Sequence, residues 1–120
     1  MNGTASKQFS SEIITINMDN FEAEVLQAKH PMLIDFWAPW CGPCRVLAPI
    51  IDQLAQDFAG RIRFGKVNID ENDELARELG IQAVPTVLLF NGDSVDMVSV
   101  GVKQRQEMRA IIENLITPKN

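Results

Sequence analysis

Metal ligands are scarce in this 120-residue sequence, which contains two cysteines and one histidine. A structural zinc site takes four ligands, most of them Cys or His, so the two cysteines and His30 are too few to build one. The chain also has no apolar run long enough to span a membrane, and its first residues lack the apolar segment of a signal peptide. We therefore expect no metal, no membrane association, and a cytoplasmic location in which thiols are kept reduced.

Positive charge is also sparse, because 11 Lys and Arg face 16 Asp and Glu and give a net charge of −5. The absence of a basic cluster argues against a nucleic-acid partner. The glycines never follow the G-x-G-x-x-G spacing, so we expect no bound nucleotide cofactor. The apolar content of 46% is enough for one core without a disulfide staple. We interpret residues 1–10 as a disordered or loosely attached extension and residues 11–120 as a single domain.

Strand and helix patterns alternate along the chain. Apolar or β-branched runs predict strands at 12–17, 32–37, 62–70, 85–90 and 94–101. Helical spacing predicts helices at 20–28, 43–60, 72–80 and 104–116. Asp19 or Asn20 is expected to cap the first helix and Gly60 to end the second, which Pro49 should kink without dividing.

The order of these elements predicts the fold class. Strands joined by helical crossovers run parallel, whereas the Asn-Gly turn at 91–92 predicts an antiparallel hairpin between the last two strands. We therefore expect an α/β fold with a mixed central sheet of about five strands, flanked by about four helices.

The two cysteines lie in the segment "WCGPC", where a buried strand ends and a helix begins. Such a close pair can be a structural staple, half of a metal site, or a redox pair, and the first two are disfavoured above. The helix N-terminus should lower the pKa of Cys41 and make it an exposed nucleophile, with Cys44 shielded one turn further in. Gly42 permits a tight turn, and Pro43 has a preset φ suited to the first helical position.

Asp35 stands in the apolar run "MLIDFW", where an ionised carboxylate is costly. A solvated strand edge is one interpretation. We favour a buried acid with a raised pKa, able to exchange a proton with Cys44 directly or through water. Lys66, in the neighbouring predicted strand, is a candidate partner of Asp35, and an exposed lysine is an equal alternative.

Several motifs together resemble one family. They are "DFWAPWCGPC" at 35–44, Pro49, "KVNID" at 66–70, "GIQAVPT" at 80–86, the Asn-Gly turn, and Gly101 before the last helix. With these motifs residues 12–117 resemble the thioredoxins of bacterial type and their fold. Arg45 is a departure, since lysine is common there, but it keeps the charge.

The resemblance implies roles that the residue pattern does not show. Pro85 would be preceded by a cis peptide bond and lie against the cysteine pair, and the backbone of Val84 would bind a substrate strand. Asp35 and Lys66 match the family's buried acid and its partner, and Trp37 matches a tryptophan packed beneath the active-site helix. An apolar docking surface would comprise Trp40, Gly42, Pro43, Val84, Pro85, Val100, Gly101 and Val102.

The function implied is that of a monomeric thiol-disulfide oxidoreductase, a cytoplasmic protein-disulfide reductase without a bound cofactor. Cys41 and Cys44 would be re-reduced by a separate flavoprotein, thioredoxin reductase, using NADPH. Targets in the family include ribonucleotide reductase, peroxiredoxins and methionine sulfoxide reductases. A binding or scaffold module with incidental thiols, and a disulfide-forming oxidase, remain alternatives. The Gly-Pro dipeptide resembles the reducing members, because oxidising relatives usually carry His before the second cysteine.

Overall fold

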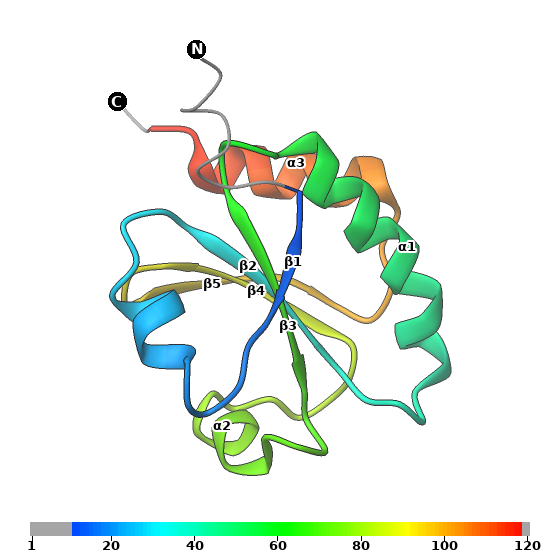
Figure 1. The fold of residues 1–120 in the computed structure, drawn as a ribbon. Helices are drawn as coiled ribbons and strands as arrows, with labels where there is room; N and C mark the ends of the chain where they lie inside the picture. The colour runs from blue at the N-terminus through cyan, green and yellow to red at the C-terminus, as the bar shows by residue number, and fades with distance from the viewer. Residues whose placement is uncertain (1–10, 119–120) are drawn as a thin grey trace.

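The computed structural model describes residues 11–118, so the extension predicted over residues 1–10 lies outside the described residues. Strands and helices alternate as predicted (Figure 1). The elements in chain order are β1 (Ile13–Thr15), the π-helix η2 (Glu22–Leu26), β2 (Met32–Trp37), α1 (Gly42–Asp57), β3 (Arg63–Asn68), α2 (Asp73–Glu78), β4 (Thr86–Asn91), β5 (Ser94–Val100) and α3 (Arg105–Ile116).

The five strands form one mixed sheet in the order β1-β3-β2-β4-β5. β1 and β2 both run parallel to β3, while β4 runs antiparallel to β2 and to β5. The β4–β5 hairpin closes between the paired residues Asn91 and Ser94, with Gly92 at a φ of 65° in the turn. The predicted α/β class, mixed sheet and hairpin are confirmed for the described part of the chain.

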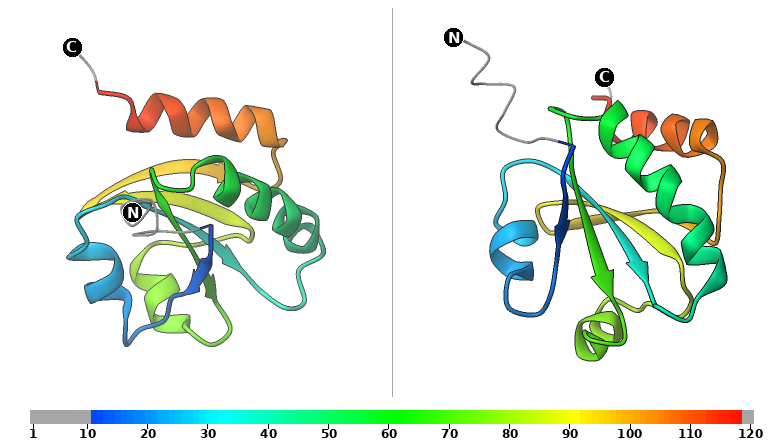
Figure 2. Two further views of the ribbon diagram at one scale, coloured as in Figure 1. Left: turned by 45° about the horizontal axis from the view of Figure 1, so that its top comes forward. Right: turned by 45° about the vertical axis from the view of Figure 1, so that its right-hand side comes forward.

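Helices cover both faces of the sheet, α1 and α3 on one and η2 and α2 on the other (Figures 1 and 2). Both faces of β2 are therefore buried, which explains its nearly continuous apolar sequence. Because side chains alternate along a strand, Leu33 joins the core under α1 and α3, whereas Ile34 and Phe36 join the opposite core. The same alternation directs Asp35 to the α1 face.

The first helix is shorter than predicted, and the caps proposed for it are wrong. The π-helix η2 begins at Glu22, follows Phe21 as its N-cap, and ends at Leu26. The side chain of Asn20 is engaged elsewhere, because its amide donates to the Thr15 carbonyl and its oxygen accepts from the Asn17 N–H. Asn20 therefore organises the loop before η2 and does not cap the helix.

The second helix is continuous through Pro49, as predicted, but it ends before the predicted stop. α1 ends at Asp57 with Phe58 as its C-cap, and Gly60 lies beyond it at a φ of 83°. Phe58 is fully buried, and its carbonyl accepts the N–H of Ile62. Anchoring of Phe58 in the core thus turns the chain toward β3 earlier than Gly60 suggests.

Gly65 in β3 is required by close packing, and we expect Gly65→Ala to destabilise the fold. A Cβ atom there would lie 2.9 Å from both Ile16 Cγ1 and Met32 Sδ. Overpacking of this kind costs about 1–3 kcal/mol, which urea unfolding would measure. Gly42→Ala is the matched control, because a Cβ at Gly42 meets nothing within 4 Å. Equal loss of stability in the two variants would contradict this explanation.

Candidate active site

The cysteine pair lies at the N-terminus of α1. Cys41 is the N-cap residue, its sulfur accepts the backbone N–H of Cys44 at 3.2 Å, and the two residues form a disulfide. Helices begin with unpaired N–H groups and a partial positive charge, so negative charge on the Cys41 sulfur would be stabilised here. Because α1 begins at Gly42, Pro43 is the second helical residue and not the first.

Both cysteines are buried in this disulfide form, each with 4% of its surface exposed. The prediction of an exposed Cys41 is therefore wrong for the disulfide form. The two cysteines share a small apolar cluster with Ala38, against which Trp37, Ile69 and Val84 pack. Ile69 and Val84, which are distant from Cys41 in the sequence, thus help to cover it. The local motif around the cysteines does not indicate this burial.

The segment around Pro85 lies beside the disulfide. The Val84–Pro85 peptide bond is cis, as the resemblance implied, and the Val84 carbonyl oxygen lies 3.6 Å from the Cys41 sulfur. The Pro85 carbonyl accepts the N–H of Gly101 at 2.8 Å. This hydrogen bond brings the turn after β5 to the same end of the sheet as the cysteines.

Most residues of the predicted docking surface are accessible around this pair. Trp40 is 66% exposed, and Val100 and Val102 are also exposed. Pro85 is buried, so its neighbour Val84, which is half-buried, presents more of this segment to solvent.

Asp70 is a site residue that the sequence analysis missed. The indole Nε1 of Trp40 donates to Asp70 Oδ1 at 3.2 Å, which orients the indole ring. Asp70 is the last residue of the "KVNID" motif, and its place in that motif could have indicated a role. Only Lys66 of this motif had been predicted to belong to the site.

Asp35 is buried on the α1 face of the sheet, with 1% of its surface exposed. Burial raises its pKa from 3.8 to about 6, and the nearby Lys66 charge partly opposes the shift. Asp35 and Lys66 are paired in register on β2 and β3, so their side chains leave the sheet on the same side. Oδ1 of Asp35 has no hydrogen-bond partner among the described residues. The expected burial and raised pKa are both present.

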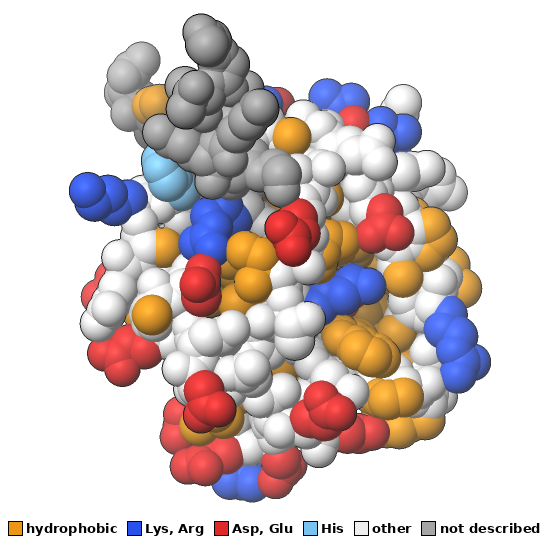
Figure 3. Space-filling model, in the orientation of Figure 1, with side chains coloured by type: hydrophobic (Ala, Val, Ile, Leu, Met, Phe, Trp, Pro, Cys, Tyr) orange, Lys and Arg blue, Asp and Glu red, His pale blue; other side chains and the backbone are white. Residues whose placement is uncertain are grey.

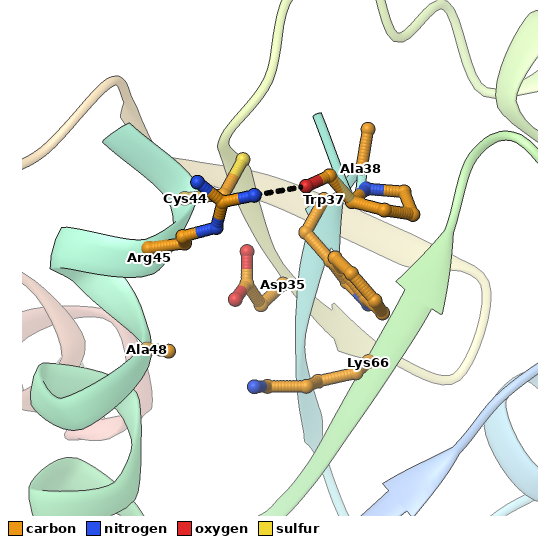
Figure 4. A pocket seen from close by; sticks show the side chains of 8 residues that line it. Asp35, Trp37, Ala38, Cys44, Arg45, Ala48 and Lys66 are labelled. Carbon is orange, nitrogen blue, oxygen red and sulfur yellow. Dashed lines mark hydrogen bonds between the residues drawn. The ribbon is translucent and has the colours of Figure 1, made fainter. Parts of the chain in front are cut away.

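A cavity of about 140 Å³ connects Asp35 with Cys44. Figure 4 shows the Asp35 carboxylate between the Cys44 side chain and the amine of Lys66, with Trp37 along the opposite wall. Arg45 also lines the cavity and donates to the Pro39 carbonyl at 2.8 Å, which ties α1 to the loop before the cysteines. The cavity is large enough for water and is bordered by polar groups, which is what a water-mediated link between Cys44 and Asp35 requires.

The surface charge agrees with the acidic composition. On the face shown in Figure 3, acidic side chains gather near α2, and hydrophobic ones gather between β3 and α1.

Among residues 11–118, no group of three or more His, Cys, Asp or Glu side chains is placed to hold a metal ion. No helix in the same range is long and apolar enough to cross a membrane.

A cysteine pair that forms a disulfide at a helix N-terminus, close to a buried acid, is suited to exchange disulfides with another thiol pair. The fold and the site together define a thiol-disulfide oxidoreductase. The family model described as Thioredoxin matches residues 12–114, and the chain belongs to the thioredoxin family. Membership makes it a protein-disulfide reductase.

Known relatives align over most of this chain. A thioredoxin of Pseudomonas aeruginosa is 36% identical over 104 residues, covering 87% of this chain and 96% of the relative. A thioredoxin of Haemophilus influenzae is 39% identical over 106 residues, covering 88% and 99%. Thioredoxin 1 of a Nostoc species is 47% identical over 94 residues, covering 78% and 87%.

Proposed function

We propose that this protein reduces disulfides of target proteins in the cytoplasm, with Cys41 as the attacking sulfur and Cys44 as the resolving one. The observation that carries this assignment is the position of Cys41 as N-cap of α1, where its sulfur accepts the Cys44 N–H. Cys44 lies within the first turn of the helix and lines the internal cavity. Only the Cys41 sulfur therefore occupies the position that stabilises a thiolate.

The reaction begins with the reduced pair. The Cys41 thiolate attacks one sulfur of the target disulfide, and the other target sulfur leaves as a thiolate. Cys44 then loses its proton and attacks the Cys41 sulfur, which breaks the mixed disulfide and releases the second target thiolate. Two electrons pass to the target, and the Cys41–Cys44 disulfide seen in the structure is the product.

Asp35 accepts the proton of Cys44 in the second step. Its carboxylate shares the cavity with Cys44, and its raised pKa, about 6, makes it a stronger base than an ordinary aspartate. Lys66 lines the same cavity, and its positive charge partly offsets the rise in the pKa of Asp35 caused by burial.

Targets dock around the disulfide on the exposed apolar side chains of Trp40, Val100 and Val102. Gly42 and Pro43 are both exposed and leave the first turn of α1 open, since a Cβ atom added at Gly42 would meet nothing within 4 Å. The backbone of Val84 and of Gly101 completes this surface.

Family membership supports the following partners. A separate flavoprotein, thioredoxin reductase, would return electrons from NADPH to the pair, so this chain needs no cofactor of its own. Disulfide-containing proteins of the ribonucleotide reductase, peroxiredoxin and methionine sulfoxide reductase types are candidate targets. The protein would act as a monomer, without nucleic acid or membrane.

Equilibration with glutathione tests the direction of electron flow. A reducing pair has the lower reduction potential, about −270 mV in thioredoxin against about −120 mV in a disulfide-forming oxidase, so it gives up its electrons more readily. In a glutathione buffer poised at about −200 mV, between these two values, we expect the pair to become mostly disulfide, whereas an oxidase pair would remain mostly dithiol. Alkylation of free thiols followed by mass spectrometry measures the two forms. A pair found mostly as the dithiol in this buffer would overturn the reductase assignment.

A further inference from the structure

An apolar groove of about 200 Å³ lies next to the docking surface, between the end of α2 and the strands β4 and β5. None of the described residues that line it is charged. A dry apolar cavity of about 150 Å³ can hold a benzene molecule, so the groove has room for one leucine or phenylalanine side chain. The residues that matter here are Leu79, Ile81, Thr86, Leu88, Met97 and Val100.

The groove is open because β5 is an edge strand that the helices cover on only one side. α3 packs on the face toward Val98, whereas α2 ends at Glu78 and does not extend over the other face of β5. On that uncovered face Met97 pairs with Leu88 and Val100 with Thr86. Met97 is 57% and Val100 54% exposed, so two apolar side chains stand in solvent beside the groove.

Val100 belongs both to this groove and to the docking surface around Cys41, so the two surfaces are continuous. The carbonyl of Val84 lies beside the Cys41 sulfur, and Leu88, at the far end of the groove, is four residues further along the chain. At about 3.3 Å per residue of extended strand, that separation is at most roughly 13 Å. An extended target segment bound through its cysteine would place a side chain in the groove about four residues away.

We propose that this groove is a target-binding subsite, which accepts one apolar side chain about four residues from the reacting cysteine of an extended target polypeptide. This inference rests on the proposed function, because the groove can contact a target only if targets dock on the adjacent surface around Cys41. Met97 is then a specificity-determining residue, since its exposed side chain forms the wall on β5. Targets with an apolar residue at that spacing react faster than targets with a polar one.

The test uses short polar peptides, each joined through one cysteine to 5-thio-2-nitrobenzoate. Phe or Ser stands about four residues before, or about four residues after, the cysteine. The pre-reduced protein is mixed with each peptide in a stopped-flow instrument, and released thionitrobenzoate is followed by absorbance. We expect one Phe peptide to react about tenfold faster than its Ser counterpart, the low end of what an apolar pocket discriminates.

Met97→Asp should remove this preference to within about twofold, because a carboxylate in the groove opposes an apolar side chain. Met97→Gln nearly conserves the shape of the side chain and should weaken the preference for the Phe peptide. It replaces Met97→Asp in the test if that variant does not fold. Val95→Asp is the matched control: Val95 is an exposed residue of the same strand, and it does not line the groove. The Val95→Asp variant should prefer the Phe peptide over the Ser peptide as strongly as the parent does.

The subsite is refuted if the parent shows no preference for either Phe peptide, or if both Met97 variants keep the parent's preference. A concentration-dependent dimer in sedimentation that Met97→Asp dissociates would also refute it, because a second copy would then occupy the groove. Failure of the parent to release thionitrobenzoate from any peptide would contradict the proposed function instead. The two failures are thus distinguishable.

Discussion

Cys41→Ser is expected to slow insulin reduction to the rate of dithiothreitol alone. A serine hydroxyl cannot form the mixed disulfide, so the first step is lost, while the second cysteine stays in the cavity beside Asp35. Precipitation of the reduced insulin B chain, followed as turbidity, measures the rate. Val46→Ser is the matched control, because Val46 is an exposed residue of the same helix, outside the site, and it should keep the parent rate.

Cys44→Ser should give a different result, which assigns the two sulfurs their roles. The Cys41 thiolate can still attack a target, but without Cys44 the mixed disulfide persists when no external thiol is present. Mass spectrometry should show the protein linked to the target, and dithiothreitol should release it. Capture by Cys41→Ser in place of Cys44→Ser would exchange the roles proposed for the two residues. Parent-like insulin reduction by Cys41→Ser would leave the thiols incidental and favour a scaffold function.

Asp35→Asn is expected to stabilise the fold at neutral and alkaline pH. The Asp35 carboxyl titrates near 3.8 when exposed and at about 6 in the folded protein. The folded state therefore holds an extra proton between these pH values, and stability falls as pH rises from about 4 to about 6 and stays lower above. A shift of about two pKa units corresponds to about 3 kcal/mol, so we expect a gain of about 2–3 kcal/mol at about pH 8.

Urea unfolding at several pH values would measure this effect. The parent should lose stability between about pH 4 and about pH 7, whereas Asp35→Asn should lack this component. Asp57→Asn is the matched control, and its expected effect on the free energy of unfolding has the opposite sign. Hydrogen bonds from Arg105 lower the pKa of Asp57, so its charge stabilises the fold, and its removal should destabilise it above about pH 4. Equal stability of Asp35→Asn and the parent at about pH 8 would contradict the cost assigned to the buried charge.

The same variant tests the catalytic role of Asp35. If Asp35 accepts the Cys44 proton, the parent's rate of insulin reduction should rise through about pH 6 as the carboxyl ionises. Asp35→Asn should be slower above that pH and lack the inflection. If Asp35→Asn is more stable but its rate depends on pH as the parent's does, Asp35 has no part in the mechanism. The cost assigned to burying its charge would still be supported by the gain in stability. Stability and turnover thus separate the structural effect of Asp35 from the chemical one.

Much of the fold was predictable because its signals are local. The nearly continuous apolar run of β2 indicated a strand covered on both faces, and Asn91-Gly92 indicated the hairpin. Helix boundaries were less predictable, since side-chain contacts outside the helix decided them. Asn20 was free to cap η2 by its position in the chain, yet it bonds to Thr15 and Asn17 instead. Gly60 is compatible with a helix end, but burial of Phe58 ends α1 earlier.

The sequence by itself determined the chemistry of the pair and its place where β2 ends and α1 begins. The spacing of Cys41 and Cys44 at a strand-to-helix junction places one sulfur at the helix N-terminus, because that geometry depends only on adjacent residues. The resemblance supplied the cis bond before Pro85, which composition does not indicate. These features are local in the chain or carried by short motifs.

Only the tertiary structure decided which groups surround the pair. The burial of Cys41, the Trp40–Asp70 hydrogen bond and the contact between Pro85 and Gly101 join residues far apart in the chain. The pKa of Asp35 likewise depends on the helix that removes water from it and on Lys66 in the next strand. Desolvation and long-range contacts are properties of the packed fold, and no local pattern specifies them. The open groove at Met97 arises in the same way, from where α2 ends relative to β5.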